Sequence, residues 1–140
     1  MSLDLVEVLI PIPLMEKFSY LPPKNNSNLL KQGSRVLVPF GKRTLVGVVW
    51  SFSERDKSSK RKYKYIKEIL DEVPLLDSNA INLAEWSSRY YHYPLGEIIS
   101  YFFPPSLRKG KEAKFRESKY LELTSKGSFL EEDALTRAPS

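Results

Sequence analysis

Short apolar runs that alternate residue by residue, each interrupted by proline or glycine, fill the first half of this 140-residue sequence. A period of two puts successive side chains on opposite faces, which is typical of β-strands. Because turn-forming residues close each run, the strands must be short and lie beside one another in a small sheet. Strands are predicted at residues 5–10, where Pro11 and Pro13 end the first run, and at 18–21, 34–40, 44–52 and 63–70.

Gly41 and Lys42 join the two central runs, and a short glycine-containing link of this kind predicts a β-hairpin. Gly47 lies inside the second of these strands and indicates a bulge or a close approach of the backbone. The polar segment 54–62 is expected to be a connection that leads back to the sheet.

Helices are predicted after the last strand. Asp77 is a good N-cap, and residues 79–91 place apolar and aromatic side chains at helical spacing. A proline and a glycine then end that helix, and a second short helix is predicted at 97–103. The predicted fold is α+β: a mostly antiparallel, barrel-like β-domain over residues 4–105, with one or two helices packed on it.

The composition changes after residue 105. Residues 106–118 are polar and basic and indicate a linker. Residues 119–124 alternate like a single strand, and the stretch 119–140 is too short to form a core of its own. We therefore expect residues 119–140 to be the truncated start of a second domain.

The sequence excludes several common kinds of catalytic and metal site, namely those that need cysteine, two histidines or a P-loop. It has no cysteine, and His92 is its single histidine, which excludes thiolate ligands and paired imidazoles. The segment from Gly33 to Lys42 does not fit a P-loop, because its spacing is wrong and no hydroxyl residue follows the lysine. The acidic run 131–133 lies in a predicted tail. We expect no metal, no membrane association and a cytoplasmic location.

Positive charge is concentrated in two short stretches. The chain carries 22 lysines and arginines against 17 acidic residues, a net charge of +5. Residues 54–67 and 108–119 hold much of this excess, which indicates a polyanionic partner. Aromatic residues lie beside basic ones, as in proteins that stack the bases of single-stranded nucleic acid. Alternatively, the basic stretches are solvated loops and the aromatic rings pack within the sheet.

Several segments together carry motifs of one known family, in that family's order. They are residues 11–14, 18–20, 33–43, 47–49, 64–71 and 84–96. The sequences Val-Pro-Phe-Gly-Lys at 38–42 and Tyr-Tyr-His-Tyr-Pro-Leu-Gly at 90–96 are the most specific. Over about residues 5–110 the chain resembles the N-terminal, 3′-DNA-end-binding domain of the PriA family of primosomal replication-restart helicases. After residue 118 the match weakens to what resembles the first strand of a winged-helix domain.

The resemblance implies a DNA-binding fragment of a longer helicase. In the family this domain captures the 3′ end of the nascent leading strand at a stalled replication fork. The motor and zinc regions come later, so ATP and zinc are implied for the parent protein and no cofactor or enzyme activity for this chain. The implied partners are forked DNA or DNA with a free 3′ end, other primosome components and single-stranded-DNA-binding protein. The implied location is the bacterial nucleoid.

The resemblance also implies a pocket for the 3′-terminal nucleotide. Phe18, Ser19 and Tyr20 match an aromatic-x-aromatic segment whose rings would stack the last base. Gly41 matches the glycine after Pro-Phe, and Lys64 matches a lysine on the following strand. The middle position of the first segment is often acidic in the family, whereas Ser19 carries no charge. Auxiliary phosphate contacts are expected from Lys42, Arg43, Arg61 and Lys62.

Two other classes of function fit the sequence. A β-rich protein-interaction module could use the basic loop 54–67 to contact an acidic partner. An RNA-binding domain fits the same charge pattern.

Overall fold

A computed structural model of the chain describes residues 4–55, 58, 60–114 and 117–129. Within them, five antiparallel strands form one sheet in the order β2-β1-β4-β3-β5. The central pair is the predicted hairpin, in which Phe40 lies opposite Arg43 across the turn at Gly41 and Lys42. The strands are β1 (Leu5–Leu9), β2 (Phe18–Tyr20), β3 (Arg35–Phe40), β4 (Arg43–Ser53) and β5 (Glu68–Ile69).

The two edges of this sheet meet. Leu21, directly after β2, forms a parallel bridge with Tyr65, shortly before β5. The Leu21 N–H donates to the Lys64 carbonyl at 2.8 Å, and the Ile66 N–H donates to the Leu21 carbonyl at 2.9 Å. Because β2 and β5 are the outer strands, this bridge closes the sheet. The predicted barrel-like α+β fold is confirmed.

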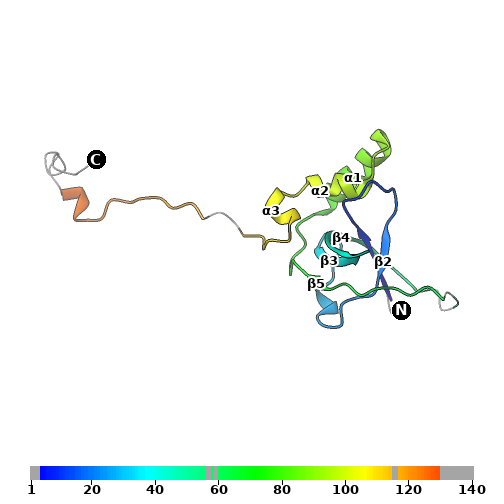
Figure 1. Cartoon of the computed structure of the whole chain (residues 1–140). Coiled ribbons are helices and arrows are strands. Elements are labelled where there is room, and N and C mark those ends of the chain that lie inside the picture. The colour runs from blue at the N-terminus through cyan, green and yellow to red at the C-terminus, as the bar shows by residue number, and fades with distance from the viewer. Residues whose placement is uncertain (1–3, 56–57, 59, 115–116, 130–140) are drawn as a thin grey trace.

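Strand alternation divides the apolar side chains between two cores. One core fills the barrel and the other lies between the sheet and the helices, so neighbouring residues such as Val8 and Leu9 belong to different cores. Figure 1 shows the three helices gathered on one side of the sheet. The barrel core consists of Val6, Val8, Ile10, Tyr20, Val36, Val38, Val49 and Ile66.

The helices are α1 (Ser78–Tyr91), α2 (Leu95–Tyr101) and α3 (Pro105–Arg108). The Asp77 side chain accepts a hydrogen bond from the Ala80 N–H at 2.8 Å, so the predicted N-cap is confirmed. At Gly96, an added Cβ would lie against the Ile10 carbonyl, so α2 packs directly on the chain that follows β1. The close approach predicted at Gly47 is also present, against Val8 and the Leu9 carbonyl.

A buried ion pair fastens the helical side to the sheet. The Arg35 guanidinium donates from Nε and Nη2 to the two carboxylate oxygens of Asp71, at 2.9 and 2.6 Å. Its Nη1 donates to the carbonyls of Leu107 and Lys111, at 2.7 and 3.0 Å. One side chain of β3 therefore holds the chain after β5, helix α3 and the residues beyond it.

The first strand ends at Leu9, just before the prolines that were expected to end it, and residues 10–14 fold into tight turns in which Ile12 and Leu14 donate two residues back. Two other predicted boundaries were wrong. The returning strand 63–70 changes its pairing partner from Leu21 to β3, so only Glu68–Ile69 qualifies as a strand. Helix α2 begins earlier than predicted, since Pro94 supplies its first carbonyl acceptor.

The segment after residue 105 also differs from the prediction. Helix α3 stands where a linker was expected, with a proline in its first turn. Residues 119–124 form no strand, and the chain there runs away from the sheet without a pairing partner among the described residues (Figure 1). Residues 130–140 of the expected second domain, including the acidic run 131–133, lie outside the described residues.

Candidate nucleic-acid interface

Phe18 and Tyr20 lie at one end of the barrel, because alternation turns both rings toward its core. The rings of Phe18 and Phe40 meet edge to face, with centroids 5.2 Å apart. The Tyr20 hydroxyl donates to the Pro39 carbonyl at 3.2 Å, and burial raises the pKa of this phenol. Tyr20 is only 4% exposed, so little of its ring is free to stack a base, whereas Phe18 and Phe40 are only partly buried.

Gly41 follows Phe40 and lies in the hairpin turn. Its φ of +57° is in the left-handed region that favours glycine. A Cβ added to Gly41 would meet no atom within 4 Å, so the space beside the turn is open. A ligand can therefore approach this backbone directly.

Lys64 lies beside the chain that follows β2. Its carbonyl accepts from the N–H of Leu21, the residue after Tyr20, while its side chain is exposed. Phe18 touches Phe40, and Phe40 precedes Gly41. The three segments that carry the predicted pocket residues therefore adjoin one another, and a single pocket formed by these residues stays a prediction.

Ser19 points to the other face of β2, as its place between two inward rings requires. Its Oγ donates to the Glu7 carboxylate at 2.9 Å to Oε1 and 3.1 Å to Oε2. Glu7 lies directly opposite on β1, and Ser53 of β4 donates to the same Oε1 at 2.9 Å. The sequence analysis did not single out Glu7; its position in an alternating strand showed only that it faces away from the barrel core.

The main chain of Ser19 faces an open edge. In a strand, the N–H and C=O of one residue point the same way, and those of alternate residues share that direction. Since the groups of Leu21 point to Lys64 and Ile66, those of Ser19 point to the same side, away from β1. Among the described residues, no backbone hydrogen bond reaches Ser19 from that side. The Ser19 N–H and C=O can therefore bond to a ligand there.

The segments that carry the predicted site residues also carry exposed cationic side chains. The auxiliary residues Lys42, Arg43, Arg61 and Lys62 are all exposed. A hollow of about 480 Å³ lies beside Tyr65, with Lys24 above its ring at 5.5 Å and Lys67 in the wall. Lys57 of the basic stretch 54–67 lies outside the described residues. The arrangement of cations and rings is suited to a polyanion.

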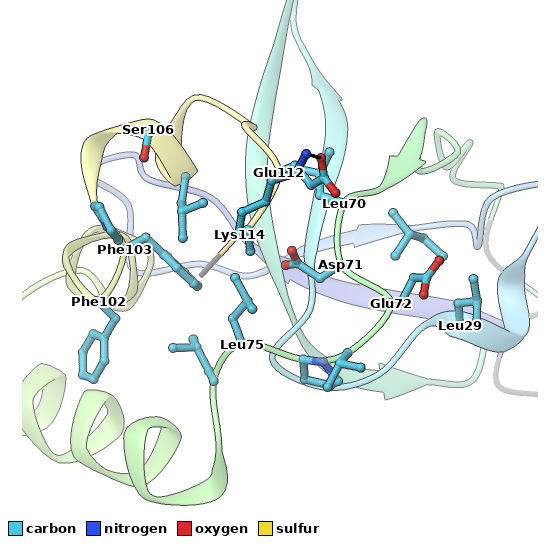
Figure 2. Close-up of a pocket in the computed structure, with 17 residues that line it drawn as sticks. Leu29, Leu70, Asp71, Glu72, Leu75, Phe102, Phe103, Ser106, Glu112 and Lys114 are labelled. Carbon is cyan, nitrogen blue, oxygen red and sulfur yellow. Dashed lines mark ion pairs between the residues drawn. The ribbon is translucent and has the colours of Figure 1, made fainter. Parts of the chain in front are cut away.

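A larger cleft of about 1100 Å³ lies elsewhere, between the chain after β5 and the helices. Figure 2 shows its walls, in which apolar side chains such as Leu75 and Phe102 stand with the acidic Asp71, Glu72 and Glu112. Negative side chains disfavour a phosphate backbone. None of the predicted site residues lines this cleft.

The described residues contain no group of three histidine, cysteine or acidic side chains that could hold a metal ion. None of their helices has the length and apolar character needed to cross a membrane. His92 is exposed and ends α1 in a left-handed conformation, with its N–H bonded to the Ser88 carbonyl.

Comparison with known families was made over the whole chain. Residues 7–104 match the PriA family model described as 3′DNA-binding domain (3′BD). The chain belongs to the PriA 3′DNA-binding domain family. This match covers the barrel and α1 and α2, so the recognition from motifs is confirmed. Membership gives the chain a DNA-binding role.

Curated relatives agree with this family. The chain is 31% identical over 125 residues, 89% of its length, to replication restart protein PriA of Haemophilus influenzae. It is 29% identical over 126 residues, 90% of its length, to PriA of Buchnera aphidicola (Acyrthosiphon pisum). The chain spans 17% of the length of each of these proteins. The family matched is a DNA-binding domain and not a helicase motor.

Proposed function

We propose that this domain captures the 3′ end of the nascent leading strand at a stalled replication fork. The observation that supports this most is that the three segments carrying Phe18, Gly41 and Lys64 adjoin one another: Phe18 packs on Phe40, which precedes Gly41, and the Lys64 carbonyl is bonded to Leu21 directly after β2. Partly buried rings, an open glycine and an exposed amine are the groups that a terminal nucleotide requires. DNA is then the direct partner.

In the proposed binding mode, the terminal nucleotide enters a pocket that is closed beyond the sugar, and the DNA does not run through a continuous groove. Half-exposed aromatic carbon at Phe18 and Phe40 contacts the last base, while the backbone of Gly41 approaches the sugar. The Lys64 amine and the cations of the hairpin attract the phosphates. A terminus is selected if the chain cannot continue past the sugar, because only a free 3′-hydroxyl then fits.

Binding to matched oligonucleotides tests this proposal. Fluorescence anisotropy would compare one DNA sequence ending in a 3′-hydroxyl with the same DNA ending in a 3′-phosphate, and with an RNA. We expect the 3′-hydroxyl DNA to bind about ten- to a hundredfold more tightly than the 3′-phosphate DNA, the range that about 1–3 kcal/mol of terminal stacking provides. Equal affinity for both DNA ends contradicts end capture.

The same measurement separates the alternatives. Tighter binding to RNA would favour the RNA-binding domain, and no binding to any nucleic acid would favour the protein-interaction module. Within a full-length PriA, the proposed partners are other primosome components and single-stranded-DNA-binding protein, in the cytoplasm and at the nucleoid of a bacterium. ATP and zinc would act outside this domain.

A further inference from the structure

Glu7 is a partly buried carboxylate on β1. Ser19 and Ser53 both donate to it, from the strands on either side of β1. Among the described residues, these hydroxyls are its only side-chain partners, and no lysine or arginine forms an ion pair with it. Within that part of the chain, a carboxylate placed in a sheet without a paired cation, in a sequence with an excess of cations, is a specific and costly arrangement.

The two serines orient the carboxylate and leave it unsaturated. In the described part of the chain, Oε1 accepts from both hydroxyls, at 2.9 Å each, whereas Oε2 accepts only the longer 3.1 Å bond from Ser19. An ionised carboxylate has about four acceptor positions. Oε2 can therefore accept another hydrogen bond from a ligand that reaches the outer face of β2.

Glu7 Oε2 lies beside β2, the strand that carries part of the candidate interface. Ser19 lies between Phe18 and Tyr20, and its main-chain N–H faces the open edge of β2. A nucleotide held at this edge meets a main-chain donor at Ser19 and the Glu7 carboxylate on the adjoining face. The donors available on a terminal nucleotide are its sugar hydroxyl and the N–H groups of its base, which are an amino group in adenine, cytosine and guanine and a ring N–H in guanine and thymine.

We propose that Glu7 is the specificity-determining residue for the DNA end: it accepts a hydrogen bond from the terminal nucleotide and repels any further phosphate. The inference rests on the proposed function, 3′-end capture. A hydroxyl donates to a carboxylate in a short, charge-assisted bond. A 3′-phosphate instead places a second anion beside an anion in a partly desolvated site, where repulsion is stronger than in water.

The Glu7→Gln variant tests the charge, because the amide keeps the size and an oxygen acceptor for the two serines. Its affinity for 3′-hydroxyl and 3′-phosphate DNA is measured by anisotropy, after circular dichroism confirms folding. We expect the preference for the 3′-hydroxyl to fall at least tenfold, mainly through tighter binding of the 3′-phosphate. Glu54→Gln, which removes one exposed charge nearby, is the matched control and should leave the preference unchanged.

A second variant tests the position of the charge. Glu7→Gln combined with Ser19→Asp moves the carboxylate across the strand pair to the directly opposite residue. We expect this double variant to recover most of the preference that Glu7→Gln loses. Recovery distinguishes a role of the charge from damage to the sheet.

DNA ends without one donor identify the group that Glu7 contacts. If the sugar hydroxyl is bound, wild type binds a 3′-deoxy end more weakly than a 3′-hydroxyl end, and Glu7→Ala binds both equally. If the base is bound, the same pattern appears when a terminal adenine is replaced by purine, which lacks the amino group.

The outcomes separate this inference from the proposed function. If wild type binds both DNA ends equally, the proposal of end capture is wrong, and the proposed role of Glu7 is then wrong too. If wild type prefers the 3′-hydroxyl and folded Glu7→Gln keeps the full preference, end capture stands and the role of Glu7 is overturned.

Discussion

The guanidinium of Arg35 and the carboxylate of Asp71 form a buried, forked ion pair, with Nη2 and Oδ1 2.6 Å apart. Both side chains are almost fully withdrawn from water, at 0% and 3% exposure. The remaining guanidinium nitrogen is bonded to carbonyls beyond α2, so every donor side of Arg35 meets an oxygen. The pair joins the barrel to its helical side.

Loss of one partner of this pair should destabilise the whole domain. Asp71→Asn leaves the buried guanidinium without a counter-charge, which costs about 3–5 kcal/mol. Urea unfolding followed by circular dichroism measures the change. Glu112→Gln, in the exposed ion pair with Lys114, is the control and should cost less than about 1 kcal/mol. Similar stabilities of the two variants would mean that the Arg35–Asp71 pair does not hold the domain together.

Substitution of Gly41 should affect DNA ends more than folding. Gly41→Asn keeps a residue that tolerates the left-handed conformation, whereas Gly41→Val adds strain of about 1–2 kcal/mol. Both fill the open space beside the turn, so both should erase the preference for a 3′-hydroxyl while leaving weak binding. Anisotropy with the two DNA ends measures this, and Lys62→Ala serves as the control that retains the preference. If a folded Gly41→Asn protein keeps the wild-type preference for the 3′-hydroxyl, the pocket does not lie at Gly41.

Affinity for DNA should fall steeply with salt. Each phosphate neutralised on single-stranded DNA contributes a log–log slope of about −0.7. Lys42→Ala and Arg43→Ala, at the exposed hairpin turn, should each make the slope shallower by about that amount. Titrations at several salt concentrations give the slopes. An affinity of wild type that does not change with salt would exclude phosphate contacts.

The stability of the domain should fall at alkaline pH through Tyr20. Burial raises the pKa of its phenol above the ordinary value near 10, so the folded state holds the proton more tightly than the unfolded state. The contribution of Tyr20 is complete below the unfolded pKa and is lost as the pH rises through the folded pKa. Urea unfolding at pH 8 to 11 measures this for wild type and Tyr20→Phe. The variant should lose less stability over this range; equal losses would contradict burial of the phenol.

Local patterns predicted the parts of the fold that local forces determine. Asp77 caps α1 because its side chain needs only a neighbouring N–H, and the turn at Gly41 needs only a residue that accepts a positive φ. The barrel closure at Leu21 and Tyr65 depends on pairing between distant segments, for which neither residue carries a signal. The last strand is shorter than predicted for the same reason: its pairing with Leu21 and then with β3 depends on distant segments.

For the candidate site too, the sequence identified individual residues but not the strand pairing that places them. Phe18, Gly41 and Lys64 were found by their motifs, and a shared pocket was implied by the resemblance alone, because no local pattern shows which distant segments lie side by side. The register that sets Glu7 opposite Ser19 follows from the pairing of β1 with β2, which the sequence of either strand alone leaves open. Nor could composition show that Arg35 is buried, since arginine is almost always exposed unless it is paired.

Lys64 contributes to the barrel and to the interface with different atoms. Its carbonyl helps to close the barrel at Leu21, and its side chain extends from that closure into solvent. A main-chain acceptor is present whatever the amino acid, so folding places little demand on the side chain at position 64. Ligand preference can therefore be re-engineered there without loss of the scaffold.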